Sequence, residues 1–161
     1  SRWAAGFDIY KVYQREFEQR FGLQKDPALE YSTITGHSTI YYDMPLLNLY
    51  TSVSLGKYLA GDIGSTVEIS RRFDSGVVLG TWFTVTDLSA ADFGEGSFDK
   101  GIFITVPWDL FYPTSDGTAG IFPFRPLTRD GGQKLNVNKS LHGITGNNYG
   151  LIERDWERVL E

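Results

Sequence analysis

The sequence predicts an all-β fold, an antiparallel meander of long strands followed by a short C-terminal helix. Aromatic residues make up 15% of the chain and there are 18 glycines, a composition that suits strands and tight turns. Apolar and polar residues alternate over long stretches, which is the period of a strand with two different faces. Short turns separate these stretches, so each strand is expected to pair with the next one along the chain.

Charge and residue content exclude several functions. The net charge of -5 argues against nucleic acid as a partner, because phosphate binding needs a basic surface. The absence of cysteine excludes disulfides, thiolate metal sites and a cysteine nucleophile. With His37 and His142 as the two histidines, a multi-histidine metal site is not expected. No nucleotide-binding glycine pattern or hydrolase motif is present, so no cofactor, no metal and no catalytic residue is assigned.

The meander is assigned to residues 1–135. Its first strand covers residues 2–17, with a helix that starts near Tyr10 as the competing interpretation. The second strand covers residues 33–43. Residues 47–88 contain three strands, joined by turns at Gly61-Asp62 and at Asp74-Ser75-Gly76.

Two further strands and a tail complete the prediction. One strand is expected at residues 101–111, and a shorter one at residues 118–124 is confined to a sheet edge by its prolines. Residues 136–161 are predicted to form a loop and a short amphipathic helix, because apolar residues recur at helical spacing between residues 148 and 160.

The strands within residues 47–88 suit a β-barrel that crosses a bilayer. Each is about 11–12 residues long, compared with about 9–11 tilted residues for a membrane-crossing strand and about 5–6 in soluble sheets. One face is aliphatic and includes Val53 and Val67, whereas the other is rich in Ser, Thr and Gly and includes Ser54 and Thr66. The aliphatic face would contact lipid and the polar face would line the interior. A charge at Val53 or Val67 is therefore expected to block assembly, and changes at Ser54 or Thr66 to be mild.

Aromatic residues near the strand ends fit an interfacial girdle: Tyr58, Phe73, Trp108, Phe111 and Tyr112. Against a porin-like barrel, the turns at both ends of these strands are tight. A soluble sandwich therefore remains an alternative.

Several side chains are candidates for contact with a polysaccharide. Arginine guanidinium groups can bind the carboxylates of an acidic polymer, and indole rings can stack on sugars. The candidate path comprises Glu68, Arg72, Trp82 and Trp108, and Arg71, Arg125 and Arg129 are further arginine candidates. Glu68 and Arg72 lie about 13 Å apart along one strand face, so each is expected to pair across strands. The alternative is that the arginines are solvated or ion-paired and the tryptophans are packing residues.

The carboxylates Asp92, Glu95 and Asp99 invite a glycosidase or a Ca²⁺ interpretation. A glycosidase needs two carboxyl groups about 5–10 Å apart, which the sequence does not place, and the spacing is not that of an EF-hand. An ordered structural loop is the preferred interpretation. In it, Asp99 or Glu95 pairs with Lys100 or with an arginine.

Two motifs carry a family resemblance. The first consists of Asp92, Phe93, Gly94, Glu95, Gly96, Ser97, Phe98, Asp99, Lys100 and Gly101. The second consists of Arg125, Pro126, Leu127, Thr128, Arg129, Asp130, Gly131 and Gly132. Together they resemble the C-terminal part of the YjbH/GfcD family of Gram-negative outer-membrane proteins, which are tied to exopolysaccharide and group 4 capsule production.

The resemblance implies a non-enzymatic outer-membrane β-barrel that takes part in polysaccharide export or assembly. Its implied partners are the polysaccharide, other export proteins and the lipid bilayer, and a lipoprotein signal is expected upstream in the longer family members. Two alternatives stay open. One is a soluble carbohydrate-binding module that uses Trp82 or Trp108 as its platform, and the other is a carbohydrate-active enzyme that uses the Asp92 loop.

Overall fold

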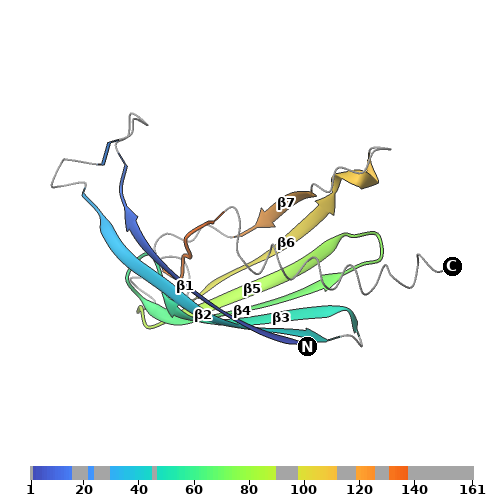
Figure 1. The fold of residues 1–161 in the computed structure, drawn as a ribbon, viewed down its shortest axis with the longest axis horizontal. Helices are drawn as coiled ribbons and strands as arrows, with labels where there is room; N and C mark the ends of the chain where they lie inside the picture. The colour runs from blue at the N-terminus through green and yellow to red at the C-terminus, as the bar shows by residue number, and fades with distance from the viewer. Residues whose placement is uncertain are drawn as a thin grey trace.

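Seven antiparallel strands form one curled sheet in the computed structural model (Figure 1). The structure describes residues 2–15, 22–23, 30–44, 47–89, 98–111, 119–125 and 131–137. A short 3-10 helix, η2 (Trp108–Leu110), follows the sixth strand. The strands are β1 (Trp3–Tyr13), β2 (Ser32–Met44), β3 (Leu49–Lys57), β4 (Ile63–Arg72), β5 (Val78–Thr86), β6 (Asp99–Pro107) and β7 (Ala119–Phe124).

The strand order in the sheet is the order in the chain, from β1 to β7. This confirms the predicted antiparallel meander. Among the described strands, β1 pairs with β2 alone and β7 pairs with β6 alone, so the curled sheet has two open edges. Proline 123 lies in the edge strand β7, as expected for a residue that has no backbone N–H to donate.

The two tight turns of the central meander form where the sequence places them. Tyr58 and Asp62 close the β3–β4 turn with a backbone hydrogen bond of 2.8 Å, and Phe73 and Val77 close the β4–β5 turn at 2.9 Å. Gly61 has a φ angle of 91° and Gly76 one of 82°. Only glycine adopts this left-handed region without a steric penalty, which explains its presence in both turns.

Several predicted boundaries are wrong. The first strand ends at Tyr13, and its last residues pair with β2, so a helix that starts at Tyr10 is excluded. Strands β3, β4 and β5 contain 9, 10 and 9 residues, shorter than predicted, because the turns take the residues at their ends. Leu59 belongs to a turn, and Leu47 precedes β3.

The sixth strand also differs from its prediction. It begins at Asp99, two residues earlier than expected, and it ends at Pro107 instead of continuing to Phe111. Pro107 is the N-cap of η2, which places Trp108 in a helical turn and not in a strand. The predicted C-terminal helix lies outside the described residues. No helix in the part of the chain that the structure describes is long and apolar enough to cross a membrane.

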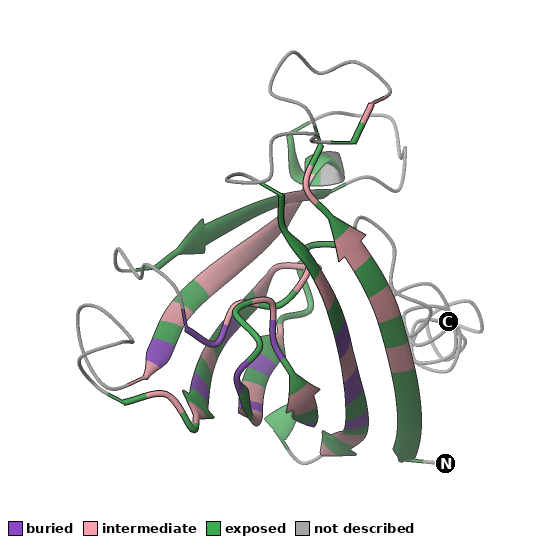
Figure 2. Ribbon diagram, turned by 90° about the vertical axis from the view of Figure 1, so that its left-hand side faces the viewer, coloured by how far each residue is buried: buried purple, intermediate pink, exposed green. Residues whose placement is uncertain are grey.

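In a water-soluble sheet the buried face is apolar and the exposed face is polar. Here the buried face is polar and the exposed face is apolar. Tyr58 is the one buried hydrophobic residue among those described, and the other buried side chains are polar or charged. Covered and exposed residues alternate along most of β2 and β5, whereas β7 and the first five residues of β1 are mostly exposed (Figure 2). The concave face is polar and covered, and the convex face is apolar and exposed. The candidate site lies on the concave face.

Candidate functional site

A row of polar side chains crosses the concave face from β2 to β6. Residues that lie directly opposite one another on adjacent antiparallel strands share a face of the sheet. The row, called the polar row below, consists of Thr39, Ser54, Thr66, Thr84 and Asp99, each paired in register with the next. All five are buried. Because the sheet curls around this face, side chains that would be exposed on a flat sheet are covered.

Hydrogen bonds between hydroxyl groups connect the polar row. Thr39 Oγ1 and Ser54 Oγ lie 3.0 Å apart, and Thr66 Oγ1 and Thr84 Oγ1 lie 2.7 Å apart. The Tyr58 hydroxyl joins the row at Thr66, at 2.6 Å. Buried polar groups of this kind need such partners, because an unpaired hydroxyl in a covered site is costly. Tyr58 therefore points into the concave face, and its predicted place in an interfacial girdle is wrong.

The row ends at Asp99, where an indole holds the carboxylate. Trp82 Nε1 donates to Asp99 Oδ2 at 3.0 Å. The Trp82 ring lies over Gly101, where any Cβ would come within 2.3 Å of the ring carbons. Arg125 lies over the Trp82 ring at 5.2 Å, within range of a cation–π contact. This glycine therefore provides the space for the tryptophan, and Arg125 lies over the ring.

A histidine and an aspartate extend the site toward β1. His37 Nδ1 lies 3.5 Å from Asp8 Oδ1, and the imidazole meets the Tyr58 ring edge-on with centroids 4.9 Å apart. Three buried atoms have no hydrogen-bond partner among the described residues: Thr35 Oγ1, His37 Nε2 and Asp62 Oδ1.

Residues 131–137, called the strap below, return to the concave face after β7. The Gly132 amide donates to Asp62 Oδ2 at 2.8 Å, and the Leu59 amide donates to the Gln133 carbonyl at 3.0 Å. The Lys134 side chain keeps solvent exposure, but burial lowers the pKa of its ammonium group. The nearby carboxylates of Glu68 and Asp8 oppose that shift in pKa. The strap thus places a cation beside two acids of the concave face.

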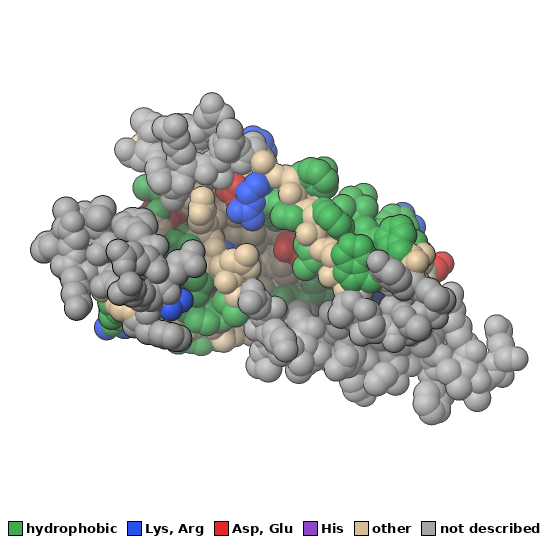
Figure 3. All heavy atoms as spheres, turned by 90° about the horizontal axis from the view of Figure 1, so that it is seen from above, with side chains coloured by type: hydrophobic (Ala, Val, Ile, Leu, Met, Phe, Trp, Pro, Cys, Tyr) green, Lys and Arg blue, Asp and Glu red, His purple; other side chains and the backbone are tan. Residues whose placement is uncertain are grey.

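The view into the concave side shows a hollow with polar atoms and charged side chains of both signs at its middle, next to hydrophobic side chains (Figure 3). No group of three His, Asp or Glu side chains among the residues described could hold a metal ion.

The convex face is mainly apolar. Phe7 is 73% exposed and Leu55 60% exposed, although both lie in regular strands. Exposed apolar residues of this face come from every strand: Trp3, Phe7, Ile9, Ile34, Ile40, Val53, Leu55, Ile63, Ile69, Leu79, Phe83, Val85, Ile102, Phe122 and Phe124. Soluble monomers rarely expose an apolar patch of this extent, which marks it as an interaction surface.

Three of the four candidate path residues share the concave face. Glu68 and Trp82 are directly paired, and Arg72 lies on the same side of β4. In register, Ser52 and Trp82 lie opposite Glu68, and Val78 lies opposite Arg72.

Two of the candidate residues lie elsewhere. Trp108 is in η2, where its ring contacts Phe111 with centroids 6.2 Å apart. Arg71 points to the convex side, over the Phe73 ring at 5.1 Å. Residues adjacent in a strand point to opposite faces, so Arg71 and Arg72 cannot line one path.

The two motifs meet in the structure, in the part of each that is described. Gly132 of the second motif sits against Asp99 of the first, because a Cβ on Gly132 would come within 3.5 Å of the Asp99 Cβ. Lys100 points to the other face of β6 and lies 4.3 Å from the Phe98 ring centroid, so the expected pairing of Asp99 with Lys100 is wrong. The other residues of both motifs lie outside the described residues: Asp92, Phe93, Gly94, Glu95, Gly96, Ser97, Pro126, Leu127, Thr128, Arg129 and Asp130.

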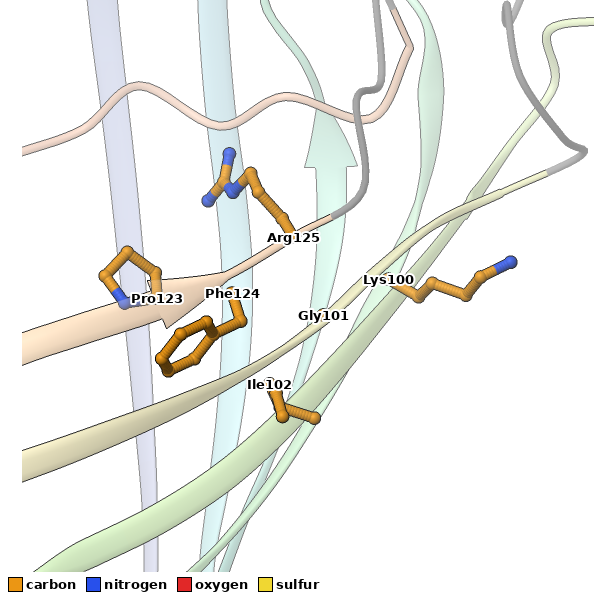
Figure 4. A pocket seen from close by; sticks show the side chains of 6 residues that line it. All are labelled: Lys100, Gly101, Ile102, Pro123, Phe124 and Arg125. Carbon is orange, nitrogen blue, oxygen red and sulfur yellow. The ribbon is translucent and has the colours of Figure 1, made fainter.

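An open groove runs along β6 and β7 at the edge of the sheet. Its lining is Lys100, Gly101, Ile102, Pro123, Phe124 and Arg125. Figure 4 shows that the Lys100 and Arg125 side chains extend in different directions. The two cations therefore do not converge on a common ligand, and the lining between them is mainly apolar.

Four members of the site were not found from the sequence. Asp62 looked like a turn residue, Tyr58 like a girdle residue, and neither Asp8 nor Lys134 belonged to a motif. Asp8, Asp62 and Lys134 each acquire their role from a partner far away in the chain, for example the 70 residues between Asp62 and Gly132. The alternation of polar residues in β3 to β5 predicts which residues share the concave face. It does not predict which of them contact one another.

The fold and the site define a protein built on a curled antiparallel all-β sheet, with a polar concave side, an apolar convex side and the segment that follows β7 docked on the concave side. Residues 1–147 match the model of the family described as "Exopolysaccharide biosynthesis protein YbjH". The chain belongs to this family, which confirms the resemblance inferred from the two motifs.

A curated relative supports the same assignment. The chain is 41% identical over 146 residues to the "Uncharacterized lipoprotein YjbH" of Escherichia coli (strain K12). The match covers 90% of the chain and 21% of that relative, so the chain spans about a fifth of the relative's length. No solved structure gives a significant match.

Proposed function

We propose that the chain is a segment of an outer-membrane β-barrel that takes part, without catalysing a reaction, in the export or assembly of an exopolysaccharide. The observation that carries the proposal is the inverted burial of the sheet. In water, the apolar convex face would be an aggregation liability and the polar concave face would be a poor core. In a bilayer, the same two faces are those of a barrel strand, apolar toward lipid and polar toward the interior.

The strand geometry supports this proposal. Strands β3, β4 and β5 have 9 to 10 residues, close to the about 9–11 tilted residues that span a bilayer. Val53, at the middle of β3, has 39% of its surface exposed. Charged residues of the convex face lie at strand ends, for example Lys57 and Arg71. An apolar band between charged ends is what a hydrocarbon layer requires.

The polar interior supports a role with a hydrated polymer. Its buried hydroxyl groups and the unpaired atoms of Thr35, His37 and Asp62 suit water or sugar hydroxyls as partners. Arg72 and Glu68 add charges to the same face. The family description names exopolysaccharide biosynthesis, and the E. coli relative is named a lipoprotein. Both names support a location in the envelope of a Gram-negative bacterium. As partners we propose the polysaccharide and other export proteins.

The geometry of Trp82 weighs against a soluble carbohydrate-binding module. A sugar platform needs an open aromatic face. One side of the Trp82 ring lies on Gly101 and Arg125 lies over the ring. Trp108 lies beside Phe111, away from the polar row. The enzyme alternative depends on Asp92 and Glu95, which are outside the described residues.

Fractionation of the intact protein tests the proposal. We expect it to sediment with outer membranes, to need detergent for extraction, and to migrate differently in gels when it is not boiled. A protein that remains a soluble monomer in buffer without detergent would overturn the proposed function. Cleavage of polymer by the purified protein, abolished by Glu95→Gln, would instead establish the enzyme alternative.

A further inference from the structure

The strap lies within the curve of the sheet and not on its outside. Its Gly132 faces Thr84 and Asp99 of the polar row, and its Lys134 is close enough to Glu68 and Asp8 to feel both charges. All four partners belong to the concave face. In Figure 1 the strap is the orange segment between β1 and β6. A segment with these contacts crosses the hollow from the β5–β6 side toward β1.

Two backbone hydrogen bonds hold one end of the strap against the β3–β4 turn. Gly132 donates to the Asp62 carboxylate, and the Gln133 carbonyl accepts from Leu59. The Leu59 carbonyl in turn accepts from the Tyr31 hydroxyl. Asp62 is 5% exposed and Gly132 is buried, so this anchor is shielded from water. A hydrogen bond to a charged acceptor in a covered site is stronger than one between neutral groups.

The shape of the anchor fits glycine and little else. Gly132 has a φ angle of 69°, a conformation that side-chain-bearing residues rarely adopt. A Cβ at this position would lie 2.9 Å from the Thr84 methyl carbon. The second glycine of the motif, Gly132, is therefore explained by close packing of the strap on the polar row.

We infer that residues 131–137 are an internal strap that closes the polar interior of the barrel segment, and that a polymer can pass along this face only after the strap leaves Asp62. The strap occupies the face that carries Glu68 and Trp82, the proposed path residues. Its Lys134 adds a positive charge near Glu68 and Asp8 of this face. This inference rests on the proposed function, because a path along the concave face presupposes a barrel.

Thiol labelling in the intact protein tests whether the strap docks at Asp62. The chain has no cysteine, so Gln133→Cys introduces a single reporter within it. In the parent protein we expect slow reaction with a water-soluble maleimide. Asp62→Ala should make it about tenfold faster, because loss of one hydrogen bond to a charged group shifts an opening equilibrium by at least that factor. Asp62→Asn, which keeps an acceptor oxygen but loses the charge, should react at a rate between those of the parent and Asp62→Ala.

Asp87 provides a matched control at the same end of the sheet. Its Oδ1 accepts from the Ile63 amide at 2.8 Å, and it does not touch the strap. Asp87→Ala should leave the labelling rate of Cys at position 133 unchanged. Should Asp62→Ala fail to fold, Gly132→Ala releases the strap from the other side of the same contact.

Conductance of the purified protein in planar phospholipid bilayers, with potassium chloride as the probe, tests closure of the path. We expect Asp62→Ala to conduct more than the parent. A disulfide between Leu59→Cys and Gln133→Cys should return the Asp62→Ala protein to the parent conductance when oxidised, and reduction should release it again.

Unchanged labelling in both Asp62→Ala and Gly132→Ala, or faster labelling without a rise in conductance, would overturn the inference. If the proposed function itself is wrong, the experiments give a different result. In that case the protein would not insert into the bilayer at all, whereas the labelling rates could still be measured in solution.

Discussion

The amide of Gly132 and the carboxylate of Asp62 are joined by a hydrogen bond of 2.8 Å across 70 residues of chain. This contact links the second family motif to the turn between the two central strands. It also brings Gly132 against Thr84 and Asp99, so that both motifs and the polar row share one packing site. Packing thus explains the glycine at position 132, because a Cβ atom there would come too close to Thr84.

Gly132→Ala should lower the free energy of unfolding of the intact protein by about 1–2 kcal/mol, the cost of a left-handed conformation for a residue with a Cβ, with an added cost from the contact with Thr84. Thr84→Ser removes the methyl group in the way and keeps the hydroxyl that bonds to Thr66. In a double-mutant cycle measured by urea unfolding, the pair should cost less than the sum of the single changes. Strict additivity would contradict this packing.

Trp82→Phe should destabilise the protein by about 1–3 kcal/mol, because the buried Asp99 carboxylate loses the indole donor. Phenylalanine also lacks the Cζ2 and Cη2 atoms that lie over Gly101, so some packing is lost together with the hydrogen bond. Thr81→Val, on the convex face next to Trp82, loses an exposed hydrogen bond from its hydroxyl to the Gly101 carbonyl at 2.9 Å and, as the control, should have a smaller effect. Urea unfolding measures both, and equal losses would mean that the indole N–H bond is unimportant.

Thr66→Val should cost about 1–3 kcal/mol, because the Tyr58 and Thr84 hydroxyls both lose a buried partner. This differs from the mild effect expected at Thr66 from the sequence alone. Ser65→Ala, one residue earlier and facing the other way, serves as the control. A Thr66→Val protein as stable as its parent would argue that water replaces the missing hydroxyl.

Val53→Arg should reduce stability by about 2–4 kcal/mol if Val53 faces the middle of a bilayer. Ser52→Arg, on the concave face opposite Glu68, should cost much less. Folded and unfolded forms separate in gels run without boiling, which gives the folded fraction during a urea titration. In water, the exposed Val53 would tolerate arginine within about 0.5 kcal/mol, so equal tolerance at both positions would contradict the facing assignment.

The sheet was predictable because the sequence features that determine it lie within short stretches of the chain. Alternation in β2 to β5 determines which residues share a face, and Gly61 and Gly76 mark where the chain reverses. Both signals lie within a few residues of the feature they predict. The two family motifs are also short stretches of sequence, and the match over residues 1–147 confirms the family that they indicate.

The contacts of the site were not predictable, because curvature and long-range docking decide them. Substitutions of Thr66 were expected to have mild effects because it is a polar residue in an alternating strand. The curl of the sheet, however, buries its side chain. Asp62 was predicted only as a turn residue, whereas its carboxylate also accepts a hydrogen bond from the Gly132 amide. The end of β6 was missed for a different reason: Ile102 to Val106 favour a strand, and Pro107 then stops it.

The strand order has a consequence for assembly. Every pairing in the sheet joins neighbours along the chain, so each strand finds its template in the strand made just before it. The sheet can therefore lengthen one hairpin at a time, without waiting for a distant segment. The contact between Asp62 and Gly132 is different, because it forms only after the intervening strands are in place. It therefore reports that the strands between Asp62 and Gly132 have paired.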